Sequence, residues 1–89
     1  MAPSKSISDA IRLVVKQDGR HPFDINQGTC YNFAAKVVAL ASGEVIENEF
    51  YNHAFILHEG KYYDAEEPEG VEEWEQLPFI QRAKRFNPQ

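Results

Sequence analysis

Three side chains that together could perform nucleophilic acyl transfer occur in order along this chain: Cys30, His53 and Asp64. A thiol is mostly protonated at neutral pH, so it becomes a strong nucleophile only where a neighbouring imidazole takes its proton. A carboxylate can then hold that imidazole in the required tautomer and stabilise its positive form. Because such a triad is defined by geometry, the elements that carry the three residues decide whether they meet.

The only cysteine of the chain, Cys30, falls at the predicted start of a helix. This helix should run from near Thr29 to Ser42-Gly43, because its apolar residues form one stripe. The stripe consists of Cys30, Phe33, Ala34, Val37, Val38 and Ala41. Unpaired backbone N–H groups and the helix dipole favour a thiolate in a first helical turn. A small structural cysteine could occupy the same place, so position alone leaves both interpretations open.

His53 and Asp64 fall on two predicted strands, "HAFILH" and "KYYDAE", which flank a plausible two-residue turn at Glu59-Gly60. With that turn, the numbers of paired residues sum to 119, so His53 lies opposite Glu66. Side chains alternate along strands, which makes His53 and Asp64 diagonal neighbours on one face, about 7–8 Å apart. A three-residue loop would separate them.

The sequence supports an alternative acid, a metal site or a phosphate-binding loop less well than the triad of Cys30, His53 and Asp64. Glu66 is the alternative acid, because the simple register places it directly opposite His53. Asp64 stands in a strand, where aspartate is disfavoured, and this argues for a special role. His21 and His58 have no ligand spacing with Cys30, so a zinc site is not expected. The chain contains no glycine-rich phosphate loop, and we expect no cofactor.

The N-terminal third is expected to hold a helix and a loop. Ile7 to Lys16 shows helical spacing of apolar residues, Ser6 can cap its start, and Asp18-Gly19 can end it. The following "RHPFDINQG" is predicted to be a loop, because His21 precedes Pro22 and is disfavoured in helical geometry.

After Gly43 the pattern changes to a period of two. "VIENEFY" is a predicted weak strand before the hairpin, and a turn is expected at Pro68-Glu69-Gly70. A helical turn should follow around Val71 to Gln76, with Trp74 and Leu77 closing one side of the core. "FIQRAKRF" is predicted to be a last strand. The predicted fold class is therefore α+β, with helices packed on a small antiparallel sheet.

Composition limits the class of protein. The 89 residues allow one domain, 1–89, and carry a net charge of −5. Eleven of the 14 acidic residues lie between Glu44 and Glu75, which argues against nucleic-acid binding. Arg82, Lys84 and Arg85 are expected on a solvated face. With one cysteine, no long apolar run and no signal-peptide pattern, a cytoplasmic protein without membrane association is expected.

The stretches "GTCYNFAAKVVALASG" and "NHAFILHEGKYYDAEEPEGV" resemble the core of the transglutaminase-like, papain-like superfamily of cysteine acyl-transfer enzymes. The resemblance covers the central half of the chain. It implies Cys30 as nucleophile, His53 as general base and acid, and Asp64 rather than Glu66 as the orienting carboxylate. It also implies Gln27 as an oxyanion donor, although Gln27 stands nearer to the cysteine than the glutamine of papain-like enzymes does.

Two functions from different classes follow from these observations. The leading expectation is a thiol-dependent enzyme of the cysteine peptidase, amidase or transamidase type, acting on a peptide, protein, amide or ester substrate. The alternative is a small acidic interaction or inhibitor protein, for example one encoded by a phage, that keeps a papain-like core without catalysis. Its acidic surface would bind a basic protein partner.

Overall fold

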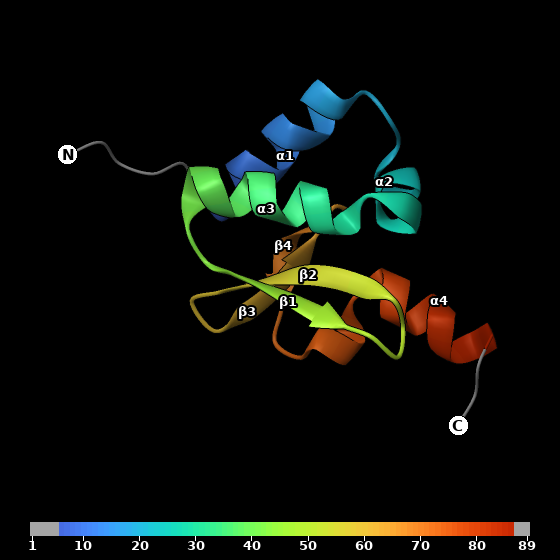
Figure 1. Cartoon of the computed structure of the whole chain (residues 1–89). Coiled ribbons are helices and arrows are strands. Elements are labelled where there is room, and N and C mark those ends of the chain that lie inside the picture. Colours follow the sequence, from blue (N-terminus) through green and yellow to red (C-terminus); the bar gives the residue numbers. More distant parts are fainter. Residues whose placement is uncertain (1–5, 87–89) are drawn as a thin grey trace.

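A four-stranded antiparallel sheet and the helices packed on it form the fold, which the computed structural model describes for residues 6–86 (Figure 1). The elements are α1 (Ile7–Asp18), α2 (Pro22–Gly28), α3 (Cys30–Ala41), β1 (Glu44–Asn48), β2 (His53–His58), β3 (Lys61–Asp64), β4 (Glu67–Val71), the 3-10 helix η1 (Trp74–Gln76) and α4 (Pro78–Phe86). The strand order is β1-β2-β3-β4, and the predicted α+β class is confirmed. None of the described helices is both long and apolar enough to cross a membrane.

Helix α1 begins and ends where the sequence predicts. The backbone N–H of Asp9 donates to the Ser6 hydroxyl at 3.1 Å, which caps the start of the helix. Gly19 follows the last turn with φ 85°, and its N–H donates to the carbonyl of Val15. Glycine adopts this left-handed conformation without steric cost, so the helix stops cleanly. One face, formed by Ile7, Ala10, Ile11 and Val14, is buried.

The predicted loop "RHPFDINQG" is wrong, because residues 22 to 28 form helix α2. His21 does have the extended conformation that a following proline favours, with ψ 143°. Pro22 then occupies the first helical position, where its missing N–H costs nothing. The ring of His21 accepts a hydrogen bond from the N–H of Phe23 at 3.1 Å and caps the helix. The proline therefore starts a helix here.

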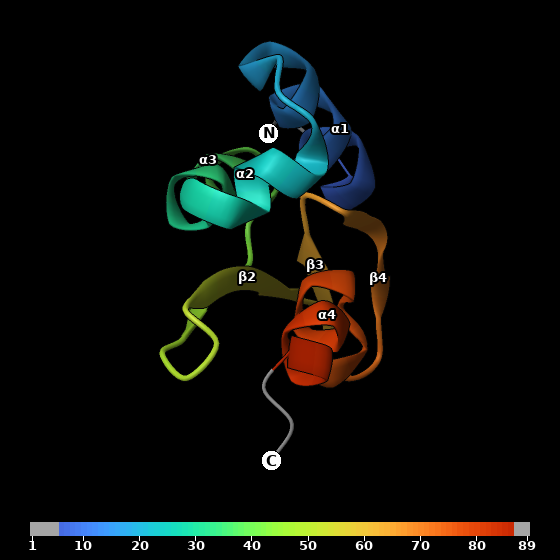
Figure 2. The same ribbon diagram turned by 90° about the vertical axis from the view of Figure 1, so that its right-hand side faces the viewer.

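Helix α3 lies between α1 and the sheet and contacts both (Figures 1 and 2). The buried members of the stripe are Phe33, Ala34, Val37 and Ala41. Gly43 follows the helix with φ 119°, and a β-carbon there would lie 2.9 Å from the carbonyl oxygen of Leu57. A larger residue would therefore collide with β2, which explains why glycine joins α3 to β1. The core formed by α1, α3 and one face of the sheet also contains Ile56 and Tyr63.

The hairpin of β2 and β3 has the predicted register. Ile56 pairs with Tyr63, and His58 pairs with Lys61, so the paired numbers sum to 119. The turn residues Glu59 and Gly60 have φ values of 49° and 83°. Positive φ at both central positions is the conformation that matches the twist of a two-residue hairpin. Strand β1, which overlaps the predicted weak strand "VIENEFY", pairs with the other edge of β2.

The C-terminal part differs from its prediction in two places. The expected turn at Pro68-Glu69-Gly70 lies inside strand β4, and the expected last strand is helix α4. Figure 2 shows α4 on the side of the sheet opposite α1 and α3. Leu77 is fully buried there, and the ring of Trp74 packs on Phe55 with 6.0 Å between ring centroids. The expectation that Trp74 and Leu77 close one side of the core is confirmed.

Candidate functional site

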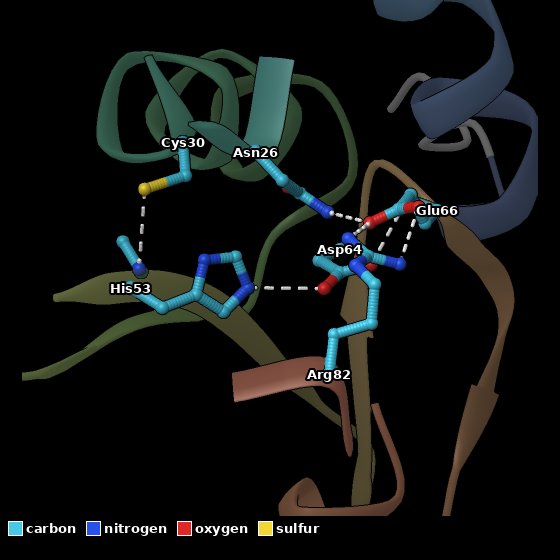
Figure 3. A network of polar contacts seen from close by, with 7 residues as sticks. Asn26, Cys30, His53, Asp64, Glu66 and Arg82 are labelled. Atoms are coloured by element: carbon cyan, nitrogen blue, oxygen red, sulfur yellow. Dashed lines mark hydrogen bonds and ion pairs between the residues drawn. The ribbon is translucent and has the colours of Figure 1, made fainter. Parts of the chain in front are cut away.

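His53, the first residue of β2, is the buried centre of the candidate site (Figure 3). Its side chain is 0% exposed, and its Nε2 atom lies 3.0 Å from Oδ2 of Asp64. The Asp64 side chain, at the end of β3, is 1% exposed. The two residues are the diagonal pair that the hairpin register predicts, because both point to the same face of the sheet. An imidazole and a carboxylate are therefore brought into contact away from water.

The second oxygen of Asp64 is also fixed. The backbone N–H of Glu66 donates to Oδ1 of Asp64 at 2.9 Å, within the turn that joins β3 to β4. With both oxygens engaged, the carboxylate can rotate little, and it holds the imidazole by Nε2. In a neutral imidazole whose Nε2 carries the proton, the other nitrogen is an acceptor. Asp64 thus favours the tautomer of His53 in which Nδ1 can take a proton.

The sulfur of Cys30 lies on the side of the His53 ring opposite to Asp64 (Figure 3). Cys30 is half-buried at the first position of α3, and its Sγ accepts a hydrogen bond from the N–H of Ala54 at 3.3 Å. Nδ1 of His53 is buried, has no hydrogen-bond partner, and faces this sulfur (Figure 3). Cys30, His53 and Asp64 therefore stand in a row, with the imidazole between thiol and carboxylate.

The environment favours the charged forms of both Cys30 and His53. Burial opposes ionisation of the thiol and is the largest single effect, but His53 and the backbone N–H groups of Ala54 and Tyr31 outweigh it, and the pKa of Cys30 is lowered. Burial also disfavours the imidazolium, but contact with Asp64 and then Cys30 outweighs this, and the pKa of His53 is raised. Both shifts favour the thiolate–imidazolium pair over the neutral thiol and imidazole.

Phe79 covers one face of the imidazole. Its ring is stacked on the ring of His53, with 4.0 Å between centroids and 14° between planes. Phe79 belongs to α4, so the predicted strand "FIQRAKRF" is wrong. The signal that could have found this helix is Pro78, which again occupies a favourable first position.

Glu66, the alternative acid, forms its hydrogen bonds with Arg82 and Asn26 and not with His53. Both of its oxygens bind the guanidinium of Arg82, at 2.7 and 3.1 Å, and Asn26 donates to one of them at 2.9 Å. Burial would raise the pKa of Glu66, but the hydrogen bonds from Arg82 and Asn26 outweigh it, and this pKa is lowered. Of the three basic residues expected on a solvated face, Lys84 and Arg85 are exposed, whereas Arg82 is partly buried and also lies 4.6 Å from the centroid of the Phe23 ring.

A pocket of about 250 Å³ opens beside the sulfur of Cys30. Three stretches line it: residues 27–32 at the junction of α2 and α3, residues 47–49 at the end of β1, and residues 52–54 at the start of β2. Gln27 is one of the lining residues and is exposed, so the structure places it at the same pocket as Cys30 and His53. The nucleophile candidate is thus accessible from outside, while the histidine beside it is not.

Comparison of the chain with protein-family models, with curated proteins and with solved structures gives no match. Within residues 6–86, no three histidine, cysteine or carboxylate side chains are grouped so as to hold a metal ion. Any function assigned to this chain therefore rests on the geometry and chemistry of the site.

Proposed function

We propose that this protein is a thiol-dependent acyl-transfer enzyme, of the cysteine peptidase, amidase or transamidase type. One observation carries the proposal: the buried His53 ring contacts Asp64 by Nε2 and turns its unpaired Nδ1 toward the sulfur of Cys30. This is the order of contacts that lets an imidazole remove a thiol proton. In the proposal, α3 and the antiparallel sheet correspond to the core of the transglutaminase-like, papain-like superfamily.

The first half of the proposed reaction forms a thioester. The Cys30 thiolate attacks the acyl carbon of an amide or ester, a C–S bond forms, and the carbonyl oxygen becomes an oxyanion. The backbone N–H of Cys30, in the first turn of α3, and the side chain of Gln27 would stabilise this charge. The C–N or C–O bond then breaks, and the leaving amine or alcohol takes the proton from Nδ1 of His53.

The second half releases the acyl group. Water, in hydrolysis, or an amine, in transamidation, attacks the thioester carbon and gives its proton to Nδ1 of His53. The C–S bond breaks, and Cys30 leaves as a thiolate beside the imidazolium, so the resting pair is restored. Asp64 stabilises that imidazolium throughout and holds the ring in position. No cofactor enters either half, and a reducing compartment would keep the single thiol active.

An acidic interaction protein is the second candidate. The observation that favours it is that several carboxylates are exposed on and beside the sheet, namely Glu44, Glu47, Glu49, Glu59, Glu69, Glu72 and Glu73. Such a surface would attract a basic protein partner and speed its association. In that case Cys30 would be a structural residue, and its thiol would react as an ordinary one.

The experiment that separates the two candidates uses p-nitrophenyl acetate, an activated ester. The enzyme proposal predicts a burst of p-nitrophenolate, an acetyl group on Cys30 detected by intact-protein mass spectrometry, and subsequent turnover. Cys30→Ser should abolish the acetylated species, and His53→Ala should slow acylation by about 100-fold or more. His58→Ala, a histidine change outside the site, should have no effect.

Acetylation of lysines alone, or equal acylation rates in the wild type and His53→Ala, would contradict the proposal. Far-UV circular dichroism of each variant shows whether it is folded, so a lost activity can be assigned to the site.

A further inference from the structure

The pocket beside Cys30 carries only negative charge on the side formed by the end of β1 and the residue that follows it. Glu47 and Glu49 line it, and no lysine or arginine does. Both carboxylates are exposed, and neither forms an ion pair with another residue of the described part of the chain. Their charge is therefore available to a bound molecule.

The register of the sheet places one of these carboxylates close to the reacting group. Glu47 pairs with Ala54 across β1 and β2, and the N–H of Ala54 donates to the sulfur of Cys30. The adjacent pair is Asn48 with His53. Ala54 therefore links the two: it is the strand partner of Glu47 and the hydrogen-bond donor to the sulfur of Cys30.

A second, independent observation marks the inner end of this pocket as the place where a ligand reacts. His53 is 3% exposed, lines the pocket, and has a buried Nδ1 atom without a hydrogen-bond partner that faces the sulfur. A buried polar atom left unpaired is costly, and a catalytic role is one of the reasons why a native structure keeps such an atom. A substrate would therefore have its acyl carbon at Cys30 and extend toward Glu47 and Glu49.

The size and the aromatic lining of the pocket limit what can bind there. At about 250 Å³ it is smaller than the roughly 300–1,000 Å³ of most small-molecule sites, so it suits one side chain next to the reacting bond. Tyr31, which is 50% exposed, lines the same pocket, and aromatic rings attract cations.

We propose that this pocket selects acyl substrates that carry a cationic side chain, lysine or arginine, next to the carbonyl attacked by Cys30. The inference rests on the proposed function, because it names the substrate class of that same site. Glu47 and Glu49 act as specificity determinants, and the chemistry at the thiol is unchanged by them. Because both carboxylates are exposed to water, each should favour a cation by roughly two- to fivefold.

The direct test compares the p-nitrophenyl esters of N-acetyl-lysine, N-acetyl-norleucine and N-acetyl-glutamate. Norleucine has the four-carbon chain of lysine without the terminal ammonium group, so the lysine to norleucine ratio of kcat/KM reports the effect of that charged group. We expect lysine above norleucine and norleucine above glutamate at low salt. The Glu47→Gln/Glu49→Gln variant should bring the lysine ester to the norleucine rate, and 1 M salt should do the same because the screening length falls to about 3 Å.

A matched control removes the same amount of charge elsewhere. Glu72 and Glu73 lie between β4 and η1, outside the pocket, so Glu72→Gln/Glu73→Gln should keep the wild-type order of the three esters. Equal kcat/KM values for lysine and norleucine esters in the wild type would overturn the inference. An equal loss of preference in both double variants would overturn it too, since it would show an effect of net charge alone.

A probe that needs no turnover keeps this inference distinct from the proposed function. Methanethiosulfonates with a trimethylammonioethyl, ethyl or sulfonatoethyl group each transfer their sulfenyl sulfur to a thiolate, forming a disulfide and releasing methanesulfinate. The ratio of cationic to anionic rates, divided by the ratio for 2-mercaptoethanol, should be about tenfold in the wild type and fall in Glu47→Gln/Glu49→Gln.

The two failures look different in this assay. If the ethyl reagent reacts at the same rate with the wild type and His53→Ala at each pH, the proposed function fails. If that reaction depends on His53 but the charge ratio matches that of 2-mercaptoethanol, the thiol chemistry stands and the cationic specificity is wrong.

Discussion

The ring of Phe79 lies nearly parallel to the imidazole of His53, with 4.0 Å between the ring centroids. This contact joins α4, the last described helix, to the first residue of β2. A stack of this kind excludes water from one face of the imidazole and fixes the plane of the ring. The position of the histidine thus depends on a residue far along the chain.

Replacing Phe79 should therefore affect both stability and thiol reactivity. Because Phe79 is partly buried, Phe79→Ala should lower the free energy of unfolding by about 2 kcal/mol, less than the loss for a fully buried phenylalanine. Alkylation of Cys30 near pH 7 should slow, since Nδ1 would no longer be held toward the sulfur. Phe86→Ala, on the same helix at 81% exposure, is the control and should change neither quantity. If Cys30 in the Phe79→Ala variant were alkylated at the wild-type rate, Phe79 would not position the imidazole.

The choice between the two acids can be tested by their isosteric amides. An asparagine at position 64 can donate its own N–H to Nε2 of His53, which would favour the tautomer with a proton on Nδ1. That imidazole cannot accept the proton of Cys30, so Asp64→Asn should slow alkylation by about tenfold or more. Glu66→Gln should remain near the wild-type rate, because Glu66 contacts Arg82 and Asn26 instead of His53. The reverse order of effects would assign the orienting role to Glu66.

The contact between Glu66 and Arg82 should appear in the pH dependence of stability. The pKa of Glu66 is lower in the folded chain than its ordinary value, so its stabilising contribution is present above the unfolded pKa and is lost as pH falls through the folded one. Urea unfolding should find Glu66→Gln less stable than the wild type by about 1–2 kcal/mol at pH 7, with the difference shrinking below about pH 4.

An exposed ion pair provides the control for that measurement. Glu69 contacts Arg12 at the surface, where both side chains are more than half exposed. Glu69→Gln should change stability little at any pH. A Glu66→Gln deficit that persists undiminished at pH 3 would mean that packing, and not the charge of Glu66, provides the stabilisation.

The sequence was sufficient where local pattern and local geometry decide the structure. The apolar stripe that includes Phe33 and Val37 predicted α3, and the two-residue turn at Glu59-Gly60 predicted the register of the hairpin. Together these placed Cys30 at a helix start and paired His53 with Asp64. Each inference depends on residues close together in the chain, and side-chain alternation extended it to the site.

Each of the three wrong predictions concerns a segment that contains a proline or directly follows one. Pro22 and Pro78 stand at first helical positions, where the missing N–H has no partner to lose, so each begins a helix. Pro68 lies in β4, one of the two edge strands of the described sheet, where a residue without an N–H is tolerated. The stack of Phe79 on His53 depends on α4, so a prediction that places a strand there cannot include this contact.

The contacts of Glu66 with Asn26 and Arg82 could not be predicted from the sequence for another reason. Asn26, Glu66 and Arg82 come from α2, the turn after β3, and α4, and they meet only through long-range packing. Nothing local distinguishes Arg82 from its exposed neighbours Lys84 and Arg85. Only the helical phase of α4, once known, turns Arg82 inward.

If His53 activates Cys30, the dependence of the alkylation rate on pH should change when the histidine is removed. Because Cys30 is the only cysteine, the rate of reaction with iodoacetamide between pH 5 and 10 reports on this thiol alone. The pKa of Cys30 is lowered and that of His53 is raised, so the wild type should react at lower pH than a free thiol does. His53→Ala should move the midpoint up toward about 8.5, the value of a free thiol. A wild-type midpoint at the free-thiol value, unchanged in His53→Ala, would mean that Cys30 is a structural residue and that the acidic interaction protein is the better description.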